Sequence, residues 1–255
     1  MFQITLTPAA SKRLIAKAMI LHLNISDALK SKTVVIIAGT TNGYIAQEIL
    51  KSIRQDQDFN AQGFFRGITT APNMKTTKMG RLSDESKFPG DVVIEKGVWQ
   101  KGKTIFDVVN DLSEGDVILK GANALNLKTR KAGILIGHPR GGTIAASLPA
   151  MIGRRVKLIH PVTLEKRIED EIDKVAKLLN EPGAQGPRLL PVPGDVFTEI
   201  DALKLLFDVK ATLVAAGGVC GAEGSVWLAI HGKKENIEKA RELLNEISKE
   251  KLFEG

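Results

Sequence analysis

Short apolar runs rich in β-branched residues alternate with segments of helical periodicity along much of the chain. The runs that predict strands lie at residues 33–38, 63–70, 90–97, 115–121, 132–137 and 155–162. The segments that predict helices lie at residues 6–20, 42–53, 103–112, 141–153 and 163–180. Short strands separated by helices predict an α/β fold, with a parallel, Rossmann-like sheet and helices on both faces in three layers.

The pattern changes at residues 181–188, which hold two prolines and two glycines in the sequence EPGAQGPR. Such a stretch is typical of a linker. We therefore predict an α/β domain at 1–182 and a small C-terminal α+β domain at 188–255. The second has the order strand, helix, strand, strand, helix, at residues 189–194, 198–207, 210–218, 225–232 and 234–250. This is a ferredoxin-like order without its last strand, for which residues 2–6 and 251–253 are both candidates.

Two kinds of short motif support these elements. Thr104 and Asp107, and likewise Thr198 and Asp201, have the spacing of a capping box at the start of a helix. The segments GDVVIEKG at residue 90 and GDVILKG at residue 115 resemble each other. The simplest interpretation of this repeat is two strands that begin after the same Gly-Asp turn.

Composition is that of a globular protein with no membrane span. The chain has 255 residues, of which 43% are hydrophobic and 25% charged, and no apolar run is long enough to cross a bilayer. The N-terminus has no secretory pattern, and the single cysteine, Cys220, forms no disulfide framework or zinc site. These features predict a cytoplasmic protein. Neither a P-loop nor a G-x-G-x-x-G motif is present, so no cofactor and no metal are predicted.

Charge narrows the choice of partner. Lys and Arg number 36 against 29 Asp and Glu, which gives a formal net charge of +7. This favours an anionic partner, either a phosphorylated small molecule or nucleic acid. Aromatic residues make up only 5% of the chain, so a stacking platform for single-stranded nucleic acid is disfavoured.

Candidate ligand-binding residues gather where strands end. In an open α/β sheet, ligands bind outside the carboxyl ends of the strands. The exits at 39–43, 120–123, 137–143 and 160–163 are rich in Gly, Thr, Lys, Arg and His and contain no acidic residue. Free amides at helix starts favour an anion there. The predicted ligand-binding residues are Gly39, Thr40, Thr41, Asn42, Gly121, Asn123, Arg140, Gly141, Gly142 and Thr143.

Each of these signals also has an ordinary structural interpretation. Thr40 or Thr41 can be a helix cap, Gly141 and Gly142 a tight turn, and Lys120 a solvated side chain. His138 and His160 each precede a proline, which is typical of extended loop residues.

The segment VVIIAGTTNGYIAQEIL at 34–50 resembles the opening of a known superfamily. That superfamily joins glucosamine-6-phosphate deaminase, ribose-5-phosphate isomerase, the CoA transferases and deoxyribose-type repressor sensor domains. GDVILKGANALN at 115–126 and GILIGHPRGGTIAASL at 133–148 resemble two further segments of it. The resemblance implies phosphate binding at the Gly-Thr-Thr turn and a homo-oligomer. Where the isomerases carry carboxylates for proton transfer, this chain has Lys120 and Asn123.

Two loops are further candidates. Residues 66–83 carry Arg66, Lys75, Lys78 and Arg81 without an acidic residue, which predicts a basic lid over the strand exits or a solvated surface loop. Residues 217–224, GGVCGAEG, either allow close backbone approach to a ligand or serve the turn between two strands.

The sequence thus predicts a protein that binds a phosphorylated small molecule, such as a sugar phosphate, at the exits 39–43, 120–123 and 137–143. These three segments are expected to line one pocket. Enzyme activity is left open: isomerase-like or CoA transferase-like chemistry would use Lys120 or His138 as the acid–base group. The alternative is a nucleic-acid-binding or ligand-sensing regulatory protein without catalysis.

Overall fold

A six-stranded mixed sheet forms the centre of the computed structural model, which describes residues 1–65, 77 and 88–251. Its strands, in spatial order, are β10 (Asp195–Phe197), β8 (Lys157–Pro161), β5 (Val117–Leu119), β2 (Thr33–Ile36), β3 (Val92–Glu95) and β4 (Val98–Trp99). The first four run parallel, as predicted, but β3 and β4 are antiparallel to their neighbours. The sheet is therefore not wholly parallel. Lys96 and Gly97 take left-handed conformations between β3 and β4, which gives a tight hairpin.

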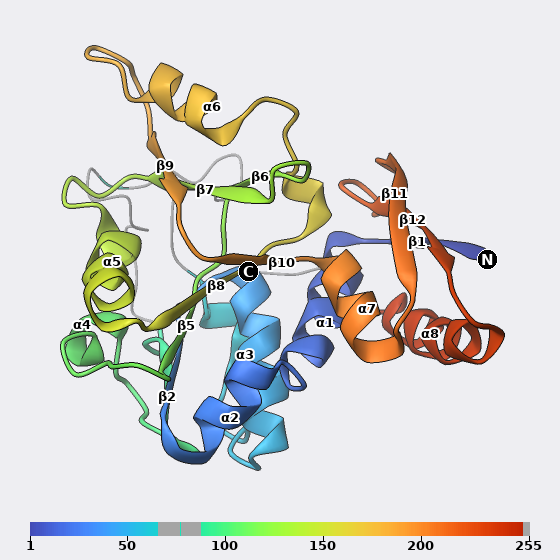
Figure 1. The fold of residues 1–255 in the computed structure, drawn as a ribbon, viewed down its shortest axis with the longest axis horizontal. Coiled ribbons are helices and arrows are strands. Elements are labelled where there is room, and N and C mark those ends of the chain that lie inside the picture. Colours follow the sequence, from blue (N-terminus) through green and yellow to red (C-terminus); the bar gives the residue numbers. More distant parts are fainter. Residues whose placement is uncertain (66–76, 78–87, 252–255) are drawn as a thin grey trace.

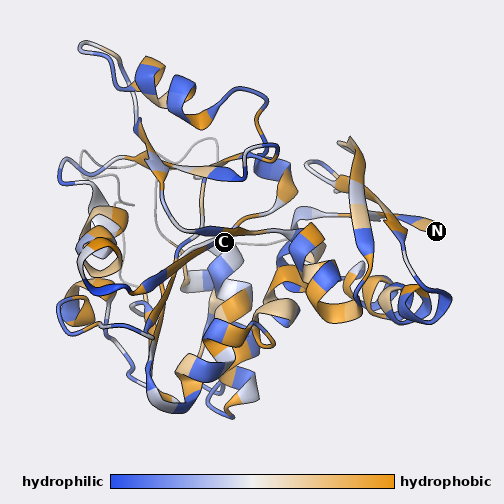
Figure 2. Cartoon of the chain, viewed as in Figure 1, coloured by the Kyte–Doolittle hydropathy of each residue, from blue (hydrophilic) through white to orange (hydrophobic). Residues whose placement is uncertain are grey.

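Helices cover both faces of this sheet (Figure 1). One side carries α4 (Ile105–Val108) and α5 (Gly142–Arg154), and the other carries α1 (Pro8–Met19), α2 (Leu23–Ser31) and α3 (Thr40–Ser52). Hydrophobic and hydrophilic residues alternate around these helices (Figure 2), as amphipathic periodicity predicts. The side chains of Ile36, Ile45 and Ile49 are fully buried between sheet and helices. Each such side chain stabilises the fold by about 2 kcal/mol.

The N-terminal strand completes a second sheet. Residues 2–6 pair as an antiparallel strand with the strand at 226–231, so this candidate for the missing strand is confirmed. The other candidate, 251–253, lies mostly outside the described residues. The sheet has the spatial order β1 (Phe2–Leu6), β12 (Val226–His231) and β11 (Lys210–Ala216), and it packs with α7 (Glu199–Phe207) and α8 (Lys234–Ile247) (Figure 1).

A third sheet was not predicted. It is antiparallel and contains β6 (Ala124–Asn126), β7 (Lys131–Ile136) and β9 (Arg188–Val192), with α6 (Ile172–Leu179) packed beside it. The strand predicted at 132–137 therefore does not join the central sheet. The strand predicted at 189–194 forms β9 of the third sheet as far as Val192; the chain then turns at Gly194, which has φ of +113°, into β10 of the central sheet, a strand that was not predicted. Strands that precede residues 181–188 and strands that follow them thus belong to the same sheets.

The predicted helix at 163–180 is interrupted. The chain instead forms a 3-10 turn η2 (Leu164–Lys166), an extended segment and then α6. The Ile168 amide donates to the Leu125 carbonyl at 2.8 Å, and the Asn126 side chain donates to two carbonyls of the same segment. These contacts with β6 satisfy the backbone without a helix, so tertiary pairing overrides the helical pattern.

The repeated Gly-Asp segments share a glycine conformation and the contacts of the Asp side chain, but their Asp amides differ: that of Asp116 donates to Ser113 in a local turn, and that of Asp91 donates to Lys103. Gly90 and Gly115 have nearly equal φ angles of +93° and +94°. Asp91 then accepts from the amides of Ala38 and Ile105, and Asp116 accepts from two amides in the same way. Each carboxylate ties the start of its strand to neighbouring backbone, so the repeat marks two strand starts, as predicted, although only the second follows a local turn.

Arg13 connects the end of α8 to α1 and α3. Its guanidinium donates two hydrogen bonds of 3.0 Å to Glu250 and one of 2.8 Å to Glu48. It also lies 4.7 Å from the centre of the Tyr44 ring. This bidentate, largely buried ion pair holds the C-terminal end of α8, which packs beside the second sheet, against α1 and α3, which cover the central sheet. Within the described part of the chain, every helix is too short or too polar to span a bilayer.

Candidate functional site

The exit from β2 leads directly into a helix start. Gly39 precedes α3, and among the residues that the structure describes a Cβ atom there would meet nothing within 4 Å. The Gly39 carbonyl accepts from the Gly43 amide, which begins the helix. Within the described residues, the amides of Thr40, Thr41 and Asn42 have no hydrogen-bond acceptor, and no side chain caps α3. This is the arrangement of donors that favours an anion at a helix start.

Two side chains of the first turn are buried and only partly satisfied. The Asn42 side-chain nitrogen donates to the carbonyls of Ile37 at 2.7 Å and Leu119 at 3.0 Å. Asn42 therefore holds the ends of β2 and β5 together, a structural role that the sequence did not predict. Among the described residues, the Asn42 oxygen and the Thr41 hydroxyl are buried without a hydrogen-bond partner. Buried polar atoms without a partner are uncommon, so these two atoms are notable.

The exit from β5 lies next to that of β2, since the two strands pair directly. The Lys120 amide donates to Ile159, and a ring nitrogen of His160 lies 2.7 Å from the Lys120 carbonyl. Asn123 faces β7, because its side-chain oxygen accepts from the Leu135 amide at 3.0 Å. The main chain of this exit is thus fixed on both sides, and Lys120 and Gly121, both partly buried, lie at the sheet edge.

His160 belongs to β8 and joins two loops. Its second ring nitrogen lies 2.9 Å from the carbonyl of Pro193, which precedes the turn into β10. Burial lowers the pKa of His160, so the ring is neutral at neutral pH and donates one hydrogen bond only. His160 is therefore a buried structural residue of the fourth exit.

The third predicted segment, 137–143, follows β7 in the third sheet. The His138 ring accepts from the Arg140 amide at 3.0 Å, and the Gly141 amide donates to the His138 carbonyl. A Cβ at Gly141 would lie 2.5 Å from that of Ala145, so a glycine is required at this turn. Gly142 and Thr143 begin α5. No hydrogen bond joins 137–143 to 39–43 among the described residues, and Asn123 connects β7 to the second exit.

A group of charged side chains that sequence reasoning missed lies at the carboxyl ends of β8 and β10. It comprises Lys12 from α1, Glu165 and Lys166 from η2, and Glu199, the first residue of α7. Glu199 is fully buried, and both of its oxygens accept from the Leu164 amide, at 3.1 and 3.0 Å. Burial raises the pKa of Glu199 to about 7. We refer to these four side chains as the Lys–Glu cluster.

The lysines of the Lys–Glu cluster have few partners. Lys12 is 8% exposed, and its nearest carboxylate oxygen, on Glu165, is 4.0 Å away. The Lys166 ammonium donates to the Ala122 carbonyl at 3.1 Å. Part of the Lys166 side chain reaches solvent, but the protein packed around its ammonium lowers the pKa to about 8, and the nearby charge of Lys12 adds to this. Perturbed groups of this kind concentrate at functional sites.

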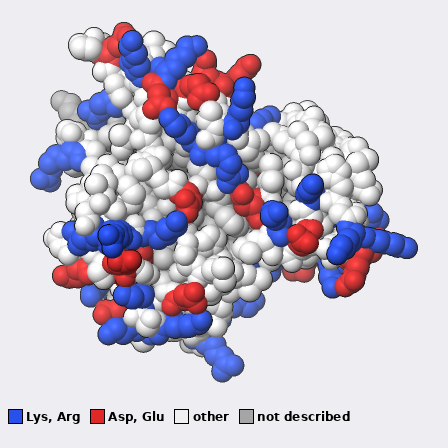
Figure 3. All heavy atoms as spheres, viewed as in Figure 1, with Lys and Arg blue, Asp and Glu red and all other residues white. Residues whose placement is uncertain are grey.

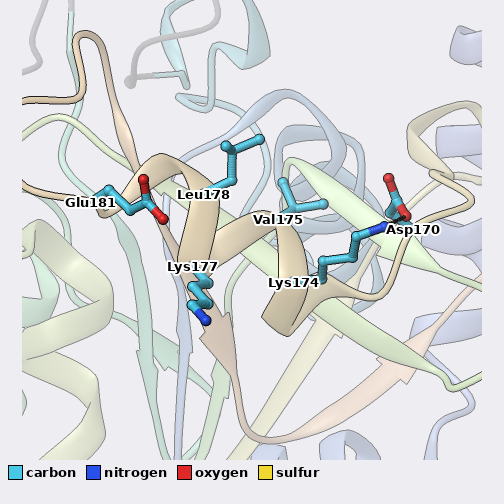
Figure 4. A pocket seen from close by; sticks show the side chains of 6 residues that line it. All are labelled: Asp170, Lys174, Val175, Lys177, Leu178 and Glu181. Carbon is cyan, nitrogen blue, oxygen red and sulfur yellow. Dashed lines mark hydrogen bonds and ion pairs between the residues drawn. The ribbon is translucent and has the colours of Figure 1, made fainter.

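Other candidate features lie elsewhere. A shallow hollow of about 260 Å³ lies along α6 and its flanks (Figure 4), with a lining of Asp170, Lys174, Val175, Lys177, Leu178 and Glu181. Its lining comes from one helical segment, away from the strand ends.

The predicted basic lid, 66–83, falls outside the described residues except for Thr77. Among the residues that the structure describes, no three His, Cys, Asp or Glu side chains form a group suited to a metal ion.

Comparisons of this chain with protein-family models, with curated proteins and with solved structures found no match.

Proposed function

We propose that the protein binds a phosphorylated small molecule, such as a sugar phosphate, at the carboxyl ends of β2 and β5. The observation that carries this proposal is the first turn of α3, where the amides of residues 40–42 and the buried Thr41 hydroxyl have no partner among the described residues. A phosphate offers several strong acceptors, and the helix dipole favours its charge. Lys120 and Gly121 at the neighbouring exit extend the same edge of the sheet.

We propose ligand binding, and whether the protein also catalyses a reaction is a separate question. Asp91 is the carboxylate next to the β2 exit, and both of its oxygens accept backbone hydrogen bonds. It is therefore a structural residue. Chemistry resembling that of the isomerases or CoA transferases would depend on Lys120 or on His138. A Rossmann-like central domain with a ferredoxin-like second lobe, a cytoplasmic location and a homo-oligomer belong to the same proposal.

Nucleic-acid binding is the second candidate, because the net charge is +7. On the face of the molecule in Figure 3, however, basic side chains are interspersed with acidic ones. This distribution favours a discrete anion site over a continuous track for a nucleic-acid backbone.

A thermal-shift screen tests the proposal. The protein is heated with sugar phosphates, nucleotides, acyl-CoAs or a short RNA, because a ligand that binds only the native state raises the melting temperature. We expect one phosphorylated compound to stabilise the wild type and not Thr41→Val, with Arg140→Ala showing whether 137–143 takes part. Thr212→Val, at an exposed position of β11, is the matched control. Stabilisation by RNA alone would overturn the proposal in favour of nucleic-acid binding.

A further inference from the structure

Lys12 is a largely buried residue, yet its ammonium has no hydrogen-bond acceptor among the described residues. It carries three donors, and the nearest carboxylate oxygen is 4.0 Å away on Glu165. Only 8% of Lys12 is exposed. Buried ammonium groups are ordinarily paired, because removal of the charge from water is costly. Among the described residues, no acceptor takes up the three donors of this largely buried ammonium, so an anion reaching it would find them available.

The acids of the Lys–Glu cluster do not supply that acceptor. Glu199 accepts from the Leu164 amide and from the Ser11 hydroxyl, and Glu165 accepts from the Thr163 hydroxyl at 3.0 Å. Each carboxylate is thus held by its own neighbours and leaves Lys12 without a hydrogen bond. Because burial raises the pKa of Glu199 to about 7, this carboxyl offsets less of the charge of the two lysines at neutral pH than an ordinary glutamate would.

The glycine-rich loop between β11 and β12 lies against the same cluster. A Cβ atom at Gly224 would be 3.5 Å from a Glu165 carboxylate oxygen and 3.2 Å from the Pro8 ring. Gly224 also has φ of +76°, which disfavours any other residue. The loop therefore brings bare backbone next to the Glu165 carboxylate of the cluster.

We infer that Lys12 and Lys166 form a binding site for the anionic group of a small molecule, a carboxylate or a phosphate, at the carboxyl ends of β8 and β10. Lys12 offers three free donors, and Lys166 has two beyond its bond to Ala122. Apart from the Ala122 carbonyl that holds Lys166, this site uses no residue of the β2 and β5 exits, so the inference does not rest on the proposed function.

Binding at this site is linked to proton uptake. The groups that face the anion are Lys12 on α1, Glu165 and Lys166 on η2, and Glu199 on α7. A bound anion favours the charged form of each lysine and the neutral form of Glu199, so it raises all of these pKa values. At pH 8, where Lys166 is half-protonated without a ligand, the complex takes up protons from the buffer.

Isothermal titration calorimetry tests the inference on the whole chain. Inorganic phosphate and, separately, succinate are titrated at pH 8 and constant ionic strength, in Tris and in HEPES. The difference between the two buffers reports proton uptake, and the two titrants distinguish a phosphate from a carboxylate site. We expect Lys12→Met and Lys166→Met each to weaken binding by about tenfold or more, as expected for loss of a charged hydrogen bond. Lys30→Met, at an exposed position of α2, should bind as the wild type does.

Thr41→Val separates this site from the proposed one. Binding that survives Thr41→Val and is lost in Lys12→Met supports the inference alone, and the reverse result supports only the proposed function. If either lysine variant fails to fold, NMR of the reductively ¹³C-methylated wild type replaces it. Phosphate or succinate should then raise the pKa of two lysine resonances. Unchanged lysine titrations, or wild-type binding without proton uptake, would overturn the inference.

Discussion

The side-chain amide of Asn42 donates a hydrogen bond of 3.0 Å to the carbonyl oxygen of Leu119, and so joins α3 to the end of β5. The same amide donates to Ile37 at the end of β2. One side chain therefore holds the ends of the parallel strands β2 and β5 together, at the edge of the sheet where we propose that the ligand binds. The same residue holds the fold together and presents an unpaired oxygen.

Asn42→Ala should lower the free energy of unfolding by about 2–3 kcal/mol, since it removes two buried hydrogen bonds and leaves the Ile37 carbonyl unsatisfied. Urea denaturation followed by circular dichroism measures this loss. Asn245→Ala, at an exposed position of α8, is the control and should change stability by less than about 0.5 kcal/mol. Equal effects of the two substitutions would contradict the bridging role of Asn42.

Thr41→Val should have opposite effects on stability and on binding. The buried Thr41 hydroxyl has no partner in the unliganded protein, so a methyl group in its place should stabilise the fold by about 1 kcal/mol. The same change removes a donor from the proposed phosphate site and should weaken ligand binding. Melting temperatures with and without ligand measure both effects. A variant that is less stable than the wild type without ligand would show that the hydroxyl is satisfied.

Glu199 should make stability fall as pH rises. Its pKa in the folded protein is raised from 4.5 to about 7, so the folded state binds the proton more tightly than the unfolded state does. The protonated carboxyl therefore contributes about 3 kcal/mol to the free energy of unfolding. This contribution is complete below pH 4.5 and is lost as the pH rises through 7. Glu199→Gln mimics the protonated form and should remove this part of the pH dependence, as measured by urea unfolding between pH 5 and pH 8. Exposed Glu238→Gln is the control, and parallel profiles for wild type and Glu199→Gln would refute the assignment.

Gly194 and Gly183 provide a matched pair of substitutions. Both have positive φ, +113° and +85°, but a Cβ at Gly194 would lie 2.6 Å from the Leu158 carbonyl, whereas one at Gly183 meets nothing. Gly183→Ala should cost about 1 kcal/mol from backbone conformation alone. Gly194→Ala should cost about 3 kcal/mol or more, because the clash at the β9–β10 junction adds to it. Similar unfolding free energies for the two variants would show that the junction relaxes.

Local features of the structure were predicted well from the sequence. The capping boxes at Thr104 and Thr198 both form, because a capping box needs only two residues three positions apart. The β2 strand and the α3 helix also lie where the apolar pattern placed them. The predicted helix at 141–153 also forms, as α5, which continues past Pro149 to Arg154.

What the sequence did not reveal depends on contacts between distant segments. Residues 132–137 have an apolar pattern that suits any buried strand, and only the pairing of β7 with β9 assigns them to the third sheet. The Lys–Glu cluster was missed for the same reason. Lys12 and Glu199 each lie in the first turns of a helix, where a charged residue is commonplace, and their neighbourhood exists only in three dimensions.

The position of β1 in the second sheet affects how the chain folds during its synthesis. Phe2 pairs with Ile230, and Leu6 with Val226, so the ribosome releases β1 long before its partner strand. The sheet of β1, β12 and β11 can close only after the whole central sheet has been synthesised, and its closure joins segments far apart in the chain. Until β12 emerges, the nascent chain carries β1 as an unpaired strand, open to a chaperone or to a neighbouring copy.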